Sequence, residues 1–139
     1  MTSISPDLLA AYMATDFKVL EPWPFVLRVG HISQALVDLY GQIDVECAGF
    51  LTAWNPYSNE TSFEENELAQ QSLIQRLSYE GYPFLKALGV DPSGDWPGED
   101  SVFVPGLDFE RAKLLGTEFG QNAIVWVGAD AVPELILLR

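Results

Sequence analysis

The sequence predicts one compact α+β domain, in which a mixed sheet of about five strands packs against three to four helices. Its length of 139 residues suits a single domain, and its 48% apolar content can fill a packed core. Segments with helical spacing and segments with strand character alternate along the chain, without repeats, linkers or low-complexity tracts. We therefore expect residues 1–139 to form one domain.

The first third of the chain predicts two helices and one strand. A helix should begin at the triplet SPD (residues 5–7), which combines a capping Ser, a first-turn Pro and an acid, and should end near Asp16. The segment WPFVLRV (residues 23–29) predicts a short strand, and the prolines at its start disfavour a central place in the sheet. Residues 31–40 have the apolar spacing of an amphipathic helix, for which Gly41 is the expected end.

The middle of the chain predicts a strand followed by a long helix. Residues 48–54 form an apolar strand that Pro56 should close, because the residue before a proline favours extended geometry. A capping-box pattern predicts a helix over residues 63–80, which Gly81 should end. Residues 82–90 fit neither a helix nor a strand clearly.

The last third predicts a loop, a helix and three strands. Residues 91–100 (DPSGDWPGED) have the Pro and Gly density of an ordered loop, and residues 101–104 should form a short strand. Asp108 should cap a helix that runs to about residue 119. Residues 123–127 (AIVWV) are apolar on both faces, as in a central strand, and residues 135–138 predict a final strand.

The composition argues against several classes of function. Twenty Asp and Glu against seven Lys and Arg give a net charge of −13, which disfavours direct binding of nucleic acid. No apolar run approaches the roughly 20 residues that span a bilayer, so no membrane contact is expected. A single cysteine suits a reducing compartment, and the N-terminus lacks a basic secretion signal, so we expect a cytoplasmic protein.

Familiar catalytic and metal sites are not expected either. The only histidine, His31, and the only cysteine, Cys47, read as a helix-start residue and a packing residue, and they cannot supply the usual ligands of zinc. An oxygen-ligand site formed by Asp91, Asp95 and Glu99 stays open, although their spacing does not match an EF-hand loop. The glycine motifs that cradle phosphates do not occur, and we expect no cofactor and no metal.

Two amides are expected on the core-facing side of helix 63–80. When successive residues advance by about 100°, Asn66 and Gln70 fall in the middle of an apolar arc. That arc is formed by Phe63, Leu73, Ile74 and Leu77. Buried amides need polar partners, because an unsatisfied one costs about 1–3 kcal/mol. The partners are either the backbone of the loop at residues 55–62 or a ligand, and both alternatives stay open.

A second polar pair precedes the strand at residues 123–127. If that strand runs antiparallel beside residues 48–54, Gln121 and Asn122 lie next to Trp54 and Asn55. If the two strands are parallel neighbours, these groups lie at opposite edges of the sheet. The strand direction therefore decides whether one polar corner exists.

Four short pieces of the chain occur in a recognisable order: TAWNP (52–56), Glu65-Asn66, WPGEDS (96–101) and FGQNAIVW (119–126). With them the chain resembles the bacterial domain-of-unknown-function 3293 family (DUF3293) over about residues 20–138. The resemblance implies a small cytoplasmic bacterial protein and supplies no activity. Its motif positions coincide with the polar corner, and Asp100 beside Glu99 leaves open which acid fills one of them. The residues at these positions are Thr52, Trp54, Asn55, Pro56, Asn66, Glu99, Gln121 and Asn122.

Our leading hypothesis is a non-enzymatic binding domain with an amide- and Trp-lined pocket for a small polar planar molecule or a peptide. The candidate ligand-binding residues are Thr52, Trp54, Asn55, Asn66, Gln70, Glu99, Gln121 and Asn122. One alternative is a small enzyme that uses Glu99 as an acid or base in that pocket. Another is a protein-interaction or inhibitor module that acts through the acidic side chains of residues 38–67.

Overall fold

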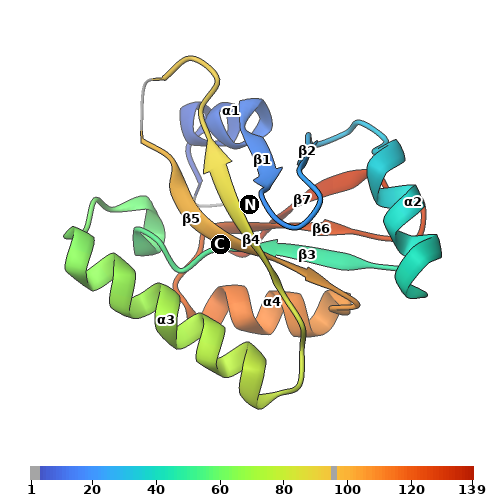
Figure 1. Cartoon of the computed structure of the whole chain (residues 1–139). Coiled ribbons are helices and arrows are strands. Elements are labelled where there is room, and N and C mark those ends of the chain that lie inside the picture. The colour runs from blue at the N-terminus through green and yellow to red at the C-terminus, as the bar shows by residue number, and fades with distance from the viewer. Residues whose placement is uncertain (1–3, 95–96) are drawn as a thin grey trace.

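The computed structural model describes residues 4–94 and 97–139, and these form one α+β domain of four α-helices and a curled seven-stranded sheet (Figure 1). The helices are α1 (Pro6–Ala14), α2 (Gln34–Ile43), α3 (Phe63–Tyr79) and α4 (Phe109–Glu118), and a short 3-10 helix, η1 (Pro56–Ser58), precedes α3. The strands are β1 (Asp16–Val19), β2 (Phe25–Leu27), β3 (Ala48–Leu51), β4 (Leu85–Val90), β5 (Glu99–Pro105), β6 (Ala123–Val127) and β7 (Pro133–Leu137).

The α+β class is confirmed, but the expected sheet needs correction. Its described strands lie in the order β2-β1-β4-β5-β3-β6-β7 and all pair antiparallel, so the sheet is not mixed and has seven strands rather than about five. The two missed strands are β1 and β4. β1 has only four residues, two of them charged, and its polar–apolar alternation (DFKV) is too short to mark a strand. β4 begins with Leu-Lys-Ala-Leu, residues that favour a helix equally well.

The ends of the helices follow their capping residues. Ser5, Ser62 and Asp108 each accept a hydrogen bond from a backbone N–H in the first helical turn, at 2.8–3.2 Å, as predicted. The prediction for α2 was wrong at its end, because Gly41 lies inside the helix. Asp44 ends α2 instead, in the left-handed conformation with φ of 58°.

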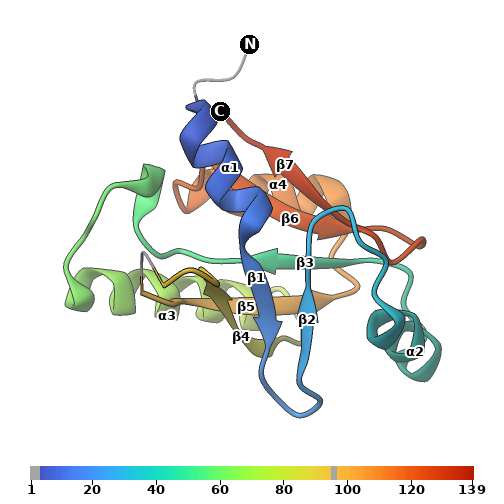
Figure 2. The same ribbon diagram turned by 90° about the horizontal axis from the view of Figure 1, so that it is seen from above.

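The sheet curls so that one face becomes a closed interior. β1 and β2 run steeply across the direction of β3, β5 and β6 in Figure 2. The backbone N–H of Gly30, just after β2, donates to the carbonyl of Pro133 in β7 at 2.9 Å, so the two edges of the sheet approach each other. The concave face is packed with large buried side chains from the strands and α2: Val19, Leu27, Leu36, Leu39, Phe50, Phe103, Val125 and Val127.

The convex face is covered by α3 and α4. Leu73, Leu77 and Leu115 pack there against strand residues such as Val102 and Val104. α4 approaches closely because residue 116 is a glycine: a Cβ there would lie 2.6 Å from Cγ2 of Ile124. None of the helices in residues 4–94 and 97–139 is long and apolar enough to cross a membrane.

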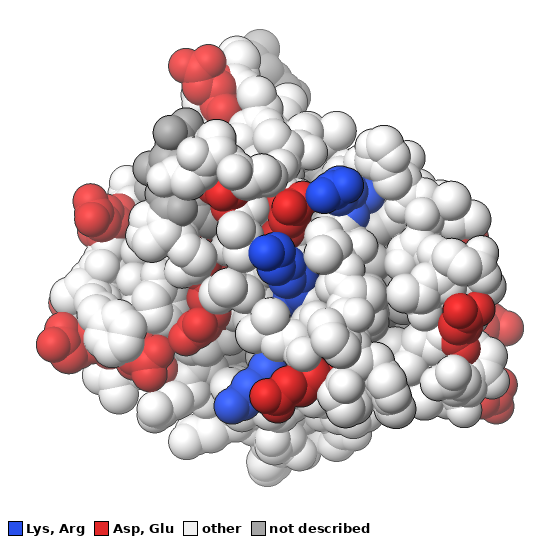
Figure 3. Space-filling model, turned by 45° about the horizontal axis from the view of Figure 1, so that its top comes forward, with Lys and Arg blue, Asp and Glu red and all other residues white. Residues whose placement is uncertain are grey.

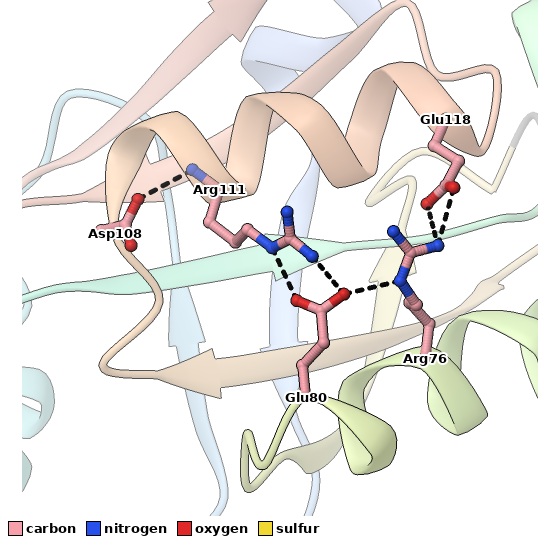
Figure 4. Close-up of polar contacts among 5 residues, drawn as sticks. All are labelled: Arg76, Glu80, Asp108, Arg111 and Glu118. Atoms are coloured by element: carbon pink, nitrogen blue, oxygen red, sulfur yellow. Dashed lines mark hydrogen bonds and ion pairs between the residues drawn. The ribbon is translucent and has the colours of Figure 1, made fainter.

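An ion-pair network joins the two helices of the convex face. Glu80 lies between two guanidinium groups (Figure 4) and accepts hydrogen bonds from Nε of Arg76 and Nε of Arg111, each at 2.6 Å. Arg76 also pairs with Glu118 of α4 at 2.6 Å. The hydrogen bonds from Arg111 and then from Arg76 hold the pKa of Glu80 below its usual value. α3 is thereby fixed relative to α4, and its N-terminal half reaches the loop that follows β3.

Candidate functional site

A cavity of about 460 Å³ lies between α1 and one end of the concave face. Side chains on a strand alternate between faces, so Phe50 and Thr52 from the β3 chain point the same way as Glu99 and Ser101 of β5. Helix α1 covers this end of the sheet, while α2 packs against the opposite end (Figures 1 and 2). The apolar wall includes Leu8, Tyr12, Phe17, Phe50, Trp54 and Leu135, and the polar wall includes Thr52, Asn55, Glu60, Glu99, Ser101 and Gln121.

The pairing of β3 with β6 creates the polar corner. The two strands are antiparallel, with Ala48 opposite Val127 and Phe50 opposite Val125. The chain before β6 therefore lies beside the chain that leaves β3, as the antiparallel alternative required. The side-chain amide of Gln121 donates to the carbonyl of Trp54 at 3.4 Å.

Asn66 and Gln70 are buried, as predicted, but they do not line the cavity. Oδ1 of Asn66 accepts the backbone N–H of Asn55 at 2.8 Å, and its Nδ2 donates to Oδ1 of Asn55 at 2.9 Å and to the carbonyl of Thr61 at 3.3 Å. Oε1 of Gln70 accepts the backbone N–H of Ala53 at 3.0 Å. Of the two alternatives left open for these amides, the geometry favours fixing the loop.

Asn55 links this buried amide pair to the cavity. Its backbone is left-handed, with φ of 46°, a conformation that Asn adopts more readily than most residues. Its Oδ1 also accepts the backbone N–H of Thr61 at 3.0 Å. Its side chain hydrogen-bonds the carboxylate of Glu99, with the amide as the donor. The contacts of Asn66 thus determine where the Asn55 amide meets the cavity wall.

Glu99, rather than its neighbour Asp100, faces the cavity. Burial raises the pKa of Glu99 to about 6, and the hydrogen bond from Asn55 acts in the lowering direction. Its neighbour Asp100 is exposed, and alternation along β5 points the Asp100 side chain to the other face. Of the two acids left open at the motif position, Glu99 is therefore the one at the cavity.

The remaining predicted residues take different roles. Thr52 lines the cavity, and its hydroxyl donates to the carbonyl of Asp100 at 2.6 Å. The indole of Trp54 lines the cavity and packs edge-to-face on Phe63, with ring centroids 5.9 Å apart. Phe63 is 66% exposed, so the expectation that it faces the core is wrong: as the first residue of α3 it lies at the surface.

Asn122 is buried but lies behind the cavity rather than on its wall. Its Oδ1 accepts from Nη1 of Arg139 at 2.9 Å, and its Nδ2 lies 3.5 Å from the hydroxyl of Tyr12. Its backbone carbonyl accepts from Leu138 at 2.8 Å. Asn122 therefore joins the end of the chain to α1.

Sequence reasoning missed the contribution of α1 and β1 to the wall. Leu8, Tyr12 and Phe17 line the cavity, but nothing local to them shows that they lie against β3 and β6. Phe50 carried a usable signal, because it alternates with Thr52 and Trp54 along one strand face.

The other chemistry considered gains no support from the geometry. Sγ of Cys47 lies 3.3 Å from the carbonyl of Leu107, and burial raises the pKa of this thiol, which fits a packing role. Among the residues that the structure describes, no three His, Cys, Asp or Glu side chains are grouped to hold a metal ion. Asp95, one of the three acids considered as ligands, and Trp96 of the WPGEDS piece lie outside the described residues.

We predict that Asn66→Ala lowers the free energy of unfolding by about 2–4 kcal/mol, since several partly buried groups lose their partner at about 1–3 kcal/mol each. Urea denaturation followed by tryptophan fluorescence measures the effect. Gln71→Ala is the matched control, because Gln71 is an exposed amide of the same helix. Equal losses in the two variants would contradict the role given to Asn66.

We also predict that Glu99 makes stability depend on pH. Because its pKa is raised from 4.5 to about 6 in the folded state, the stability it contributes is complete at low pH and is lost as the pH rises through about 6. Glu99→Gln removes this titration, so from about pH 4 to about pH 7 the wild type should lose roughly 1–2 kcal/mol relative to the variant. Urea denaturation at several pH values tests this, with Asp100→Asn as the control; a flat difference between wild type and Glu99→Gln would refute it.

A comparison with protein-family models matches residues 51–124, more than half of the chain, to the family described as Protein of unknown function (DUF3293). The matched segment is shorter than the region expected from the motifs, but it contains Trp54, Asn55, Asn66, Glu99 and Gln121. No curated protein and no solved structure matches the chain. The resemblance found in the motifs is confirmed, and the chain belongs to the DUF3293 family of proteins of unknown function.

Proposed function

We propose that this protein is a binding domain that holds a small molecule in the cavity beneath α1. One observation carries the proposal: Thr52, Trp54, Asn55, Glu99 and Gln121, which come from three separate motif pieces, line the same cavity. The volume of about 460 Å³ lies within the range of small-molecule sites, about 300–1,000 Å³. α1 lies over the cavity, which favours a compact ligand over an extended peptide.

The wall supports this proposal through its mixture of side chains. Phe17, Phe50 and Trp54 offer apolar rings, while Asn55, Glu99 and other polar groups stand among them. Ligand sites commonly combine a mostly apolar wall with a few placed polar groups that orient the ligand. The side chain of Asn55 is held by Asn66 and Thr61, so this part of the site is already ordered before a ligand arrives.

Helix α1, which covers the cavity, offers a route by which a ligand could enter. α1 buries none of its residues, although Leu8, Ala11 and Tyr12 lie on the cavity wall. A helix with little buried surface can move at low cost. We propose that displacement of α1 admits the ligand.

We also propose where the protein is located. The single cysteine favours a reducing compartment, and the family resemblance favours a bacterium, so we propose the bacterial cytoplasm. The net charge of −13 disfavours direct binding of nucleic acid.

A fragment screen by thermal shift tests the binding function. We predict that some fragments raise the midpoint temperature of unfolding of wild type but not that of Ala123→Phe. In this variant the added ring fills the cavity that Ala123 lines. Trp54→Ala should weaken the binding of the same fragments, because it removes one apolar part of the cavity wall. Tyr79→Ala is the control, since Tyr79 is 89% exposed on α3. Ligands that stabilise all four proteins equally would eliminate the cavity as the binding site.

Acid–base catalysis by Glu99 is the second candidate function, and the pKa of about 6 favours it. A carboxyl group that titrates in this range can accept or donate a proton near neutral pH. If the protein is an enzyme, wild type should convert a ligand found in the screen, and the rate should change with pH near 6. Glu99→Gln should bind the same ligand without converting it. Mass spectrometry of the ligand after incubation measures this conversion. A ligand that binds to wild type but is not converted would contradict catalysis and leave binding as the function.

The acidic interaction module gains less support. The acids of residues 38–67 lie either in or just after α2, or just before and at the start of α3, and these two regions are at opposite sides of the molecule in Figures 1 and 2. Figure 3 shows acidic groups towards both sides of the visible face and several basic side chains between them. The run of acids in the sequence therefore does not form one continuous surface for a basic partner.

A further inference from the structure

The charged side chains on the described wall of the cavity are both acidic. Glu60 and Glu99 are on its wall, and among the described lining residues there is no Lys, Arg or His. Within the described part of the chain Glu99 forms no salt bridge, and its hydrogen-bond partner is the neutral amide of Asn55. A partly desolvated carboxylate that lacks a cationic partner gains more from an arriving cation than a solvated one does.

The remaining wall is suited to a flat apolar body. Tyr12, Phe17, Phe50 and Trp54 surround the cavity with aromatic rings. Such rings pack against apolar groups, and their faces attract cations. The net charge of −13 adds a field that favours the approach of cations and disfavours anions.

We infer that the ligand of this cavity is a small cationic amine that carries an aromatic or otherwise flat apolar group. This inference rests on the proposed binding function and narrows it. The protonated amine donates hydrogen bonds to the carboxylate of Glu99, and the flat group packs against the aromatic wall that includes Trp54. Phosphates and carboxylic acids are poor ligands for the same site, because they meet Glu99 and Glu60 without a compensating cation.

Three indole compounds test this inference because they share the ring and have side chains of similar length but different charge. Tryptamine carries a cationic amine, tryptophol a neutral hydroxyl and indole-3-acetate an anionic carboxylate. Isothermal titration calorimetry at about pH 7.5 should give a Kd for tryptamine about tenfold below that of tryptophol, as expected for one charge-assisted hydrogen bond, and no binding of indole-3-acetate.

Two variants assign the preference to Glu99. Glu99→Gln should bind tryptamine and tryptophol about equally, since it keeps the shape of the side chain and removes its charge. Asp100→Asn removes the same charge one residue away, on the other face of β5, and should keep the preference of wild type.

The preference for tryptamine over tryptophol should also decrease as the pH is lowered. The titratable side chains on the described wall are Tyr12, Glu60 and Glu99. Protonation of Glu99 removes the negative charge that the amine meets, so tryptamine should lose its advantage over tryptophol between about pH 7.5 and about pH 5. Asp100→Asn should show the same pH dependence as wild type, because the side chain of Asp100 points to the other face of β5.

The outcomes separate this inference from the function on which it rests. Equal binding of tryptamine and tryptophol to wild type, or a preference that persists in Glu99→Gln, overturns the amine inference and leaves the binding cavity standing. The same holds if the fragment screen finds cavity ligands while none of the indole compounds binds at up to about 10 mM. If neither experiment finds a ligand, both the inference and the binding function are refuted.

Discussion

The interaction between Asn66 and Asn55 is the constraint on which the site depends. One buried amide holds both the backbone N–H and the side-chain oxygen of Asn55, which sits in a left-handed conformation. Because the oxygen of Asn55 is occupied, its N–H groups are directed to Glu99. The chain that leaves β3 can then turn away from the sheet with Trp54 on the cavity wall. A polar contact in the core thus shapes a surface feature.

The cavity arises from the way the sheet curls. Large side chains fill the concave face beneath α2, whereas the opposite end is lined by smaller or polar residues such as Thr52, Ser101 and Ala123. α1 covers this end without burying its own residues. The side-chain amide of Asn122 lies 3.5 Å from the hydroxyl of Tyr12 in α1, and its backbone carbonyl accepts from Leu138 just after β7. The fold therefore leaves a sheltered space with a single inner carboxylate, a setting that suits recognition and proton exchange alike.

The sequence predicted the parts that rest on local rules. Helix caps at Ser5, Ser62 and Asp108 follow from turn chemistry, and the inward position of Asn66 follows from helical spacing. β4 was not predicted, because its residues favour a helix as well as a strand. Its strand conformation depends on pairing with β1 and β5. The place of α1 over the sheet could not be predicted, since those contacts join residues about 110 apart in the sequence, such as Tyr12 and Asn122.

The site is centred on the carboxyl group of Glu99, which is sheltered in the cavity and hydrogen-bonded by the amide of Asn55. Carbon-13 NMR of protein labelled at glutamate carboxyl groups follows that group directly, with Glu99→Gln to assign its signal. We expect the Glu99 resonance to titrate with a midpoint near 6. A midpoint near the ordinary value of 4.5 would mean that water reaches the carboxylate freely, and the sheltered cavity would not exist.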